Sequence, residues 1–201
     1  MASSMMHKKI PPEQLGFDFD GVIADVAEAF IRLADEQYGL QGITKDDITH
    51  FDVDQCLAIT PAKAEDIFHQ ILVDSIGTGL KPIDGAVEVL TDLAKRSSVT
   101  VITARPLEQP VHDWLRVFFP QDSLPSIHVV AMGAHDDKAR HIRANGIRYF
   151  IDDRAETCVQ LEGTGIQPIV FSQPWNKNRH QLPMVSSWQE IKALCCQEEQ
   201  P

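Results

Sequence analysis

Two aspartates separated by one residue follow a short apolar segment near the N-terminus. Residues 17–22 read FDFDGV, so Asp18 and Asp20 are the acids and a glycine follows the second one. A helix-like pattern begins at Asp25, and we interpret the whole as a strand, a tight turn and a helix. Groups just beyond the carboxyl ends of parallel strands face the ligand crevice. We therefore expect both carboxylates to face one substrate.

The chemistry open to this pair is phosphoryl transfer. A carboxylate can attack a phosphoryl group and form an aspartyl-phosphate, which makes Asp18 a candidate nucleophile. Asp20 would then protonate the leaving oxygen and later activate water. Two acids and a phosphate repel one another unless Mg²⁺ and fixed donors neutralise them. The alternative is an aspartate-rich turn that closes a strand, and on these residues alone both interpretations stand.

Composition restricts the partners. The chain has 201 residues, 43% of them hydrophobic, which is enough for one domain or one domain with a small insert. Its 29 acidic and 18 basic residues give a net charge of -11. That balance argues against a nucleic-acid duplex or an anionic membrane surface as a partner. Any attraction for an anionic substrate must therefore be local.

The cysteines and the N-terminal segment suggest a cytoplasmic protein. The 4 cysteines form no C-x-x-C pair, which indicates neither a disulfide framework nor a zinc site. Residues 1–14 lack the apolar core of a signal peptide, and no apolar run approaches membrane-spanning length. We expect a reducing, cytoplasmic location.

Residues 25–80 are expected to form a helical insert. Apolar positions from Val26 to Tyr38 follow helical spacing, and Gly39 is placed to end that helix. Thr44 and the pair Thr60-Pro61 are further helix-start signals. We predict a helical cap domain over residues 25–80, with residues 10–24 and 81–195 forming an α/β core.

The core shows alternating strand and helix patterns. After the first strand, β-type runs are expected at residues 99–102, 127–131, 149–151 and 168–171. Helical patterns lie between and after them, at residues 111–118, 136–145, 155–161 and 188–195. This alternation predicts a Rossmann-like, three-layer α/β fold with a parallel sheet.

Polar residues follow the predicted strands. Thr103 ends one of them, and its hydroxyl and the following backbone N–H of Ala104 can hold a phosphate oxygen. Asp152 and Asp153 end another and offer oxygen ligands to a hard cation. Lys138, at a helix start, could offset these acids. Taken singly, each has an ordinary alternative. Thr103 could simply be a threonine in a strand, the aspartates could be a helix N-cap, and Lys138 could be a solvated lysine.

Taken in order, these residues resemble the four motifs of the haloacid dehalogenase superfamily. The resemblance covers about residues 17–153. It implies Mg²⁺-dependent phosphoryl transfer on a Rossmann-like sheet, with an inserted helical cap closing over the site. The acid at position 20 favours the phosphatases and mutases over the dehalogenases, which do not carry it.

For each motif, the resemblance implies a role for the residue at that position. It implies that Asp18 is the nucleophile and Asp20 the general acid/base, and that Thr103 binds phosphate. Lys138 would steady the nucleophile and the phosphate. The metal ligands would be Asp18, the backbone carbonyl of Asp20, Asp152 and, through a water molecule, Asp153. Arg105 and Arg154 either contact substrate or pair with acids, and we expect the second.

Weaker resemblances connect the chain with the cytosolic 5′(3′)-deoxyribonucleotidase group. They lie in residues 18–25, 47–51, 82–86 and 171–176. They imply a nucleoside monophosphate as substrate, with Phe51 or Phe68 either lining a base pocket or packing in the core. The alternatives are a sugar phosphate or a similar small phosphorylated metabolite, and a module that binds a phosphorylated ligand without turnover.

Overall fold

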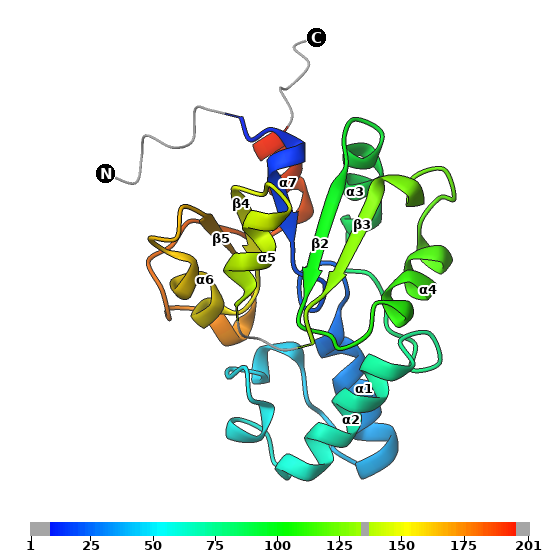
Figure 1. The fold of residues 1–201 in the computed structure, drawn as a ribbon. Helices are drawn as coiled ribbons and strands as arrows, with labels where there is room; N and C mark the ends of the chain where they lie inside the picture. The colour runs from blue at the N-terminus through cyan, green and yellow to red at the C-terminus, as the bar shows by residue number, and fades with distance from the viewer. Residues whose placement is uncertain (1–8, 134–136, 196–201) are drawn as a thin grey trace.

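A parallel sheet forms the centre of the molecule. The computed structural model describes residues 9–133 and 137–195. Its sheet has 6 strands in the order β3-β2-β1-β4-β5-β6, every neighbouring pair parallel (Figure 1). The strands are β1 (Leu15–Phe17), β2 (Val99–Thr103), β3 (Ile127–Ala131), β4 (Tyr149–Asp152), β5 (Gln167–Phe171) and β6 (Met184–Val185). The sheet confirms the predicted fold class, and β6 adds a strand that is too short to show a sequence period.

Helices connect the strands and cover both faces of the sheet. They are α1 (Val26–Tyr38), α2 (Pro61–Val73), α3 (Ala86–Ala94), α4 (Gln109–Phe118), α5 (Lys138–Ala144), α6 (Ala155–Leu161) and α7 (Trp188–Cys195). The predicted helix over 136–145 is observed from Lys138, while residues 134–136 lie outside the described ranges. Among the described residues, no helix has both the length and the apolar character needed to cross a membrane.

The two faces of the sheet pack into two apolar clusters. Successive strand residues point to opposite faces, so Val101 joins the larger cluster with Trp188 of α7, whereas Ile102 joins the smaller one with Ile142 of α5. β2 is buried along its whole length. Burial on both faces explains why these strands read as continuous apolar runs rather than alternating ones.

Helices α1 and α2 pack against each other beyond one end of the sheet (Figure 1). The rings of Phe30 and Phe68 stack between them, with centroids 4.8 Å apart. Gly39 caps α1, as its position predicts. The start expected at Thr44 yields only a short 3₁₀ turn, Lys45–Asp47, because no apolar stripe at helical spacing follows it. We keep residues 25–80 as a proposed cap.

The two segments that join this insert to the core run side by side. Ala24 and Pro82 form an antiparallel bridge. The N–H of Asp25 donates to the carbonyl of Lys81 at 2.8 Å, and the N–H of Ile83 donates to the carbonyl of Ile23 at 2.8 Å. The insert is therefore attached to the core through a paired, hydrogen-bonded double linker.

Candidate active site

Three neighbouring strands carry the predicted site residues at their carboxyl ends. β1 lies between β2 and β4. Asp18 follows β1 directly and donates its backbone N–H to Ile151 of β4 at 2.8 Å. Thr103 and Asp152 are the last residues of β2 and β4. The chain continues from β1 to β2 and β3 on one side of β1 and then crosses to β4 on the other side. This is the topological switch point, where open α/β sheets bind ligands.

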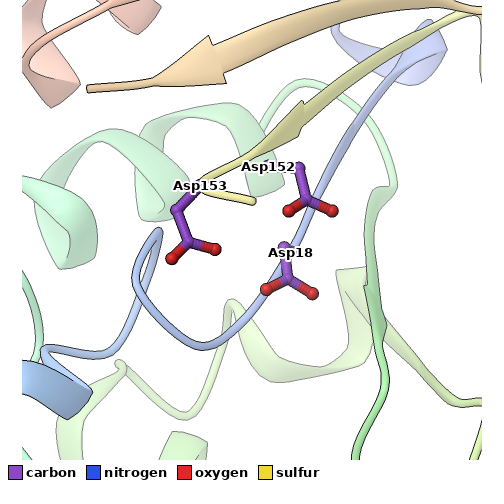
Figure 2. Close-up of side chains that lie close together, drawn as sticks. All are labelled: Asp18, Asp152 and Asp153. Carbon is purple, nitrogen blue, oxygen red and sulfur yellow. The ribbon is translucent and has the colours of Figure 1, made fainter. Parts of the chain in front are cut away.

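Three buried carboxylates gather at this point, and we call them the acid cluster: Asp18, Asp152 and Asp153 (Figure 2). One oxygen of each lies within 4.8 Å of the others. Lys138 Nζ, also buried, donates to Asp18 Oδ1 at 2.8 Å and to Asp152 Oδ2 at 2.6 Å. Lys138 thus lies beside the acids that it was expected to offset, and not in solvent.

Burial dominates the electrostatics of the cluster. Desolvation, with the neighbouring charges of Asp152 and Asp20, raises the pKa of Asp18 to about 7 against the pull of Lys138. Burial also raises the pKa of Asp153 well above its ordinary value. Burial alone would lower the pKa of Lys138, but the carboxylates of Asp152 and Asp18 outweigh it and raise that pKa. Without a cation, burial therefore favours the protonated forms of Asp18 and Asp153.

The cluster fits a hard divalent cation. When ionised, its three carboxylates against the single ammonium of Lys138 leave two negative charges, which one divalent ion would neutralise. The donor set consists of carboxylate oxygens, which Mg²⁺ prefers to nitrogen or sulfur. Asp18, Asp152 and Asp153 are the side chains that could hold it.

Asp20 faces a different partner. Its two carboxylate oxygens accept hydrogen bonds from Arg105, with Nε to Oδ2 at 2.8 Å and Nη2 to Oδ1 at 2.7 Å. Arg105 was expected to pair with an acid, and it does. The predicted metal role of Asp20 rests on its backbone carbonyl, and it stays a prediction.

One pocket, of about 370 Å³, contains every site residue predicted from the sequence. Its lining includes the acid cluster, Asp20, Thr103, Ala104 and Lys138. The hydroxyl oxygen of Thr103 accepts the N–H of Arg105 at 3.3 Å, so the segment after β2 turns around this side chain. The volume lies in the range of small-molecule sites.

Sequence comparison finds one family whose model matches nearly the whole chain. A model of the family described as 5′ nucleotidase, deoxy (pyrimidine), cytosolic type C protein matches residues 13–200. The chain belongs to this family. The match confirms the haloacid dehalogenase resemblance and makes this protein a phosphatase of that superfamily. No curated protein sequence matches at a significant level.

Solved structures share the fold of this nucleotidase-family member at low sequence identity. A haloacid dehalogenase-superfamily hydrolase from Ehrlichia chaffeensis aligns with a TM-score of 0.56 at 14% identity, covering 92% of this chain and 96% of the other. A haloacid dehalogenase-like protein from Streptococcus pneumoniae aligns with a TM-score of 0.60 at 12% identity, and the alignment covers 89% of this chain and 96% of the other. A protein from Lactobacillus plantarum described as a phosphoglycolate phosphatase aligns with a TM-score of 0.59 at 12% identity, and the alignment covers 92% of this chain and 100% of the other.

The insert supplies the outer wall of the pocket. Phe68 of α2 packs against the core and also lines the pocket, and its contact with a base stays a prediction. Phe51 lines it while 37% exposed, and the Arg154 guanidinium lies 4.6 Å from its ring centroid. Exposed carboxylates lie on the same side: Asp52, Asp54 and Glu65. The insert thus contributes apolar, aromatic and acidic side chains to the pocket, and the core contributes the acid cluster, Lys138 and the predicted phosphate ligands.

Residues after β5 hold the acid cluster in place. The resemblance had suggested Asn176 and Lys177 as part of the rim of the site, but these contacts were not predicted. Trp175 Nε1 donates to Asp153 Oδ2 at 2.9 Å, and Asn176 Nδ2 donates to the carbonyl of Asp153 at 2.7 Å. Gln173 Nε2 donates to the carbonyl of Gly21 at 2.7 Å. Amide side chains directly after a buried strand adjacent to β4 were the available signal, but only the resemblance had drawn attention to 171–176.

Proposed function

We propose that this phosphatase is a Mg²⁺-dependent 5′-nucleotidase that hydrolyses nucleoside or deoxynucleoside monophosphates through an aspartyl-phosphate on Asp18. One observation carries the proposal. The buried acid cluster with Lys138 lines the same pocket as Phe51 and Phe68, two aromatic side chains of the insert. Such a pocket suits a ligand with a phosphate at one end and a flat, neutral ring at the other.

In the first step, a carboxylate oxygen of Asp18 attacks the phosphorus, and the bond from phosphorus to the ester oxygen breaks. Asp20 gives that oxygen its proton, so the nucleoside leaves as a neutral alcohol. Lys138 holds Asp18 through Oδ1 and brings positive charge to the place where the phosphoryl oxygens would lie. Thr103 and the backbone N–H of Ala104 would bind those oxygens.

In the second step, a water oxygen attacks the phosphorus of the aspartyl-phosphate and gives a proton to Asp20. The bond between phosphorus and Asp18 breaks, which regenerates the carboxylate of Asp18 and the protonated form of Asp20 and releases inorganic phosphate. When bound, Mg²⁺ would neutralise the cluster and the phosphoryl charge. The side chains that would hold it are Asp18 and Asp152, with Asp153 acting through water; the backbone carbonyl of Asp20 would complete the set.

The outer wall supports a nucleotide over the alternatives. Asp52, Asp54 and Glu65 would repel a second phosphate or a carboxylate at the far end of a substrate. This counts against small diacids such as phosphoglycolate. A sugar phosphate would present hydroxyls to a wall that includes Phe51 and Phe68, which suit the face of a base better.

Two further predictions belong to the same proposal. Residues 25–80 would act as a cap whose closure excludes water from the site and limits which leaving groups fit. A cytoplasmic location is proposed from the family's description as cytosolic type, together with the cysteine pattern.

The decisive experiment is phosphate release from a panel of nucleoside monophosphates, sugar phosphates, phosphoglycolate and p-nitrophenyl phosphate, each with and without Mg²⁺. We expect selective, metal-dependent turnover of nucleotides, and none by Asp18→Asn. Turnover of other esters but not nucleotides would reject the substrate class and keep the chemistry. Equal release by Asp18→Asn would reject the nucleophile. No turnover by the folded parent would favour a module that only binds phosphorylated ligands.

A further inference from the structure

Arg105 joins the carboxylate of Asp20 to the end of the insert. Beyond its two hydrogen bonds to Asp20, Arg105 donates from Nη1 to Ser75 Oγ at 2.7 Å and to the carbonyl of Leu72 at 3.4 Å. Leu72 lies in the last turn of α2, and Ser75 follows that helix. Ser75 Oγ in turn donates to the carbonyl of Ile71 at 2.9 Å. The proposed acid/base and the cap thus share one arginine.

The arginine itself is rigidly held. Its side chain is 1% exposed, and its guanidinium carbon lies 4.8 Å from the ring centroid of Phe19. Its backbone carbonyl accepts the N–H of Gly133 at 3.1 Å, which ties the segment after β2 to the segment after β3. Each of the three guanidinium nitrogens already donates to a protein oxygen. Arg105 is therefore built to orient a protein group rather than to bind substrate directly.

Asp20 has one side open to the pocket. Its side chain is 24% exposed and lines the pocket, while Arg105 covers the other side. A bidentate arginine–carboxylate pair fixes the plane of the carboxylate as well as its position. An ammonium cannot reproduce that geometry, because it acts as a point charge without a planar fork.

We propose that Arg105 is a positioning residue, which holds Asp20 in line for proton transfer and couples that carboxylate to the cap through Ser75 and Leu72. The role rests on the proposed function, because it needs Asp20 as acid and base. Any movement at the end of α2 would shift the acceptors of Nη1 and so the orientation of Asp20. The competing interpretation is a purely structural contact that only anchors the linker.

The first test uses the dependence on the leaving group. A nitrophenolate leaves without a proton, whereas an alkoxide needs one from Asp20. We compare Arg105→Met with the parent in single-turnover reactions, using p-nitrophenyl phosphate and whichever alkyl phosphate of the panel the parent hydrolyses fastest. The expected loss in rate is about 100-fold for the alkyl ester and within about 3-fold for the release of nitrophenol. Equal losses with both substrates would overturn the positioning role.

The second test is a double-mutant cycle with Asp20→Asn. If Arg105 acts through Asp20, Arg105→Met should cost less than about 3-fold more in the Asp20→Asn background, because the group it positions is already disabled. A full additional loss there would show that Arg105 acts by another route. Arg116→Met, which removes an exposed arginine paired with Asp113 on α4, is the matched control and should equal the parent.

Two milder variants keep the proposal testable should Arg105→Met fold poorly. Arg105→Lys retains the positive charge but not the planar guanidinium, so its rate should fall less than that of Arg105→Met, and again more for the alkyl ester than for p-nitrophenyl phosphate. A rate equal to that of the parent on the alkyl ester would overturn the positioning role. Ser75→Ala keeps the pair of Arg105 with Asp20 and removes the hydroxyl that accepts from Arg105 Nη1. It should slow hydrolysis of the alkyl ester alone, and an unchanged rate would overturn the coupling to the cap. A parent inactive on every ester would reject the proposed function, and the positioning role with it, whereas an active parent with unaffected Arg105 variants rejects the role alone.

Discussion

Lys138 donates a hydrogen bond of 2.8 Å to Oδ1 of Asp18, although 120 residues separate the two in the chain. Both side chains are about nine-tenths buried, and the same ammonium reaches Asp152. The contact joins the start of α5 to the end of β1 and brings a positive charge next to the proposed nucleophile.

Replacing Lys138 by Met should lower both activity and stability. The change leaves buried carboxylates without their cation, which should lower the free energy of unfolding by about 3 kcal/mol. It also removes a hydrogen-bond donor from the site, which should lower kcat by about 100-fold or more. Lys192→Met is the control, since Lys192 also pairs with two carboxylates, Glu88 and Asp92, but at the surface. Chemical denaturation and steady-state kinetics measure both effects. Similar losses in the two variants would contradict a special role for Lys138.

The metal-free protein should lose stability as the pH rises. Burial raises the pKa of Asp18 to about 7 from 3.8, so the folded protein holds this proton more tightly than the unfolded chain. Unfolding then releases protons between about pH 4 and about 7, and the free energy of unfolding falls through that window by up to about 4 kcal/mol from this group. Thermal unfolding of Asp18→Asn should show a flatter profile over the same range.

A bound cation should reverse that trend. The ion competes with the proton for Asp18, so Mg²⁺ should raise the melting temperature more at about pH 8 than at about pH 5. Paired thermal scans with and without Mg²⁺ measure the difference. An equal shift at both pH values would show that the ion binds away from the acid cluster.

Replacing Gly21 by Ala should damage the cluster from the backbone side. Gly21 has a φ of 74°, and a Cβ built there would lie 2.3 Å from Asp153 Oδ2. We expect a loss of about 1–3 kcal/mol from strain and a fall in Mg²⁺ affinity of about 10-fold or more as Asp153 is displaced. Gly39→Ala separates these effects, because Gly39 has a similar φ of 67° and no atom within 4 Å. If both variants bound Mg²⁺ like the parent, Asp153 would have no part in binding the ion.

Removing the ring of Phe51 should affect nucleotides selectively. Stacking of a base on an aromatic ring contributes about 1–3 kcal/mol, so Phe51→Ala should raise KM for nucleoside monophosphates by about 10-fold. Hydrolysis of glycerol phosphate, which has no ring, should change little. Val117→Ala, at an exposed residue of α4 outside the pocket, is the control. Equal changes for both substrates would remove Phe51 from base recognition.

The order and type of the core elements could be predicted from local patterns. The strand at Ile127–Ala131 and the helix at Ala155–Leu161 agree with the expected bounds, because their apolar runs and turn residues are complete within a few positions. Local signals failed at Thr44, where a good capping residue begins no lasting helix, and at Met184–Val185, which is too short to show a period. Local propensity yields to tertiary packing at such places.

The sequence by itself determined that acids, a threonine and a lysine follow successive strands and helices of a parallel sheet, since strand ends and their polar residues are encoded locally. Only the tertiary structure decided how these side chains are used. It buried Lys138 between Asp18 and Asp152, turned Asp20 to Arg105, and brought Trp175 to Asp153. These contacts join residues far apart in the chain, and their geometry depends on strand order and packing that no local pattern specifies.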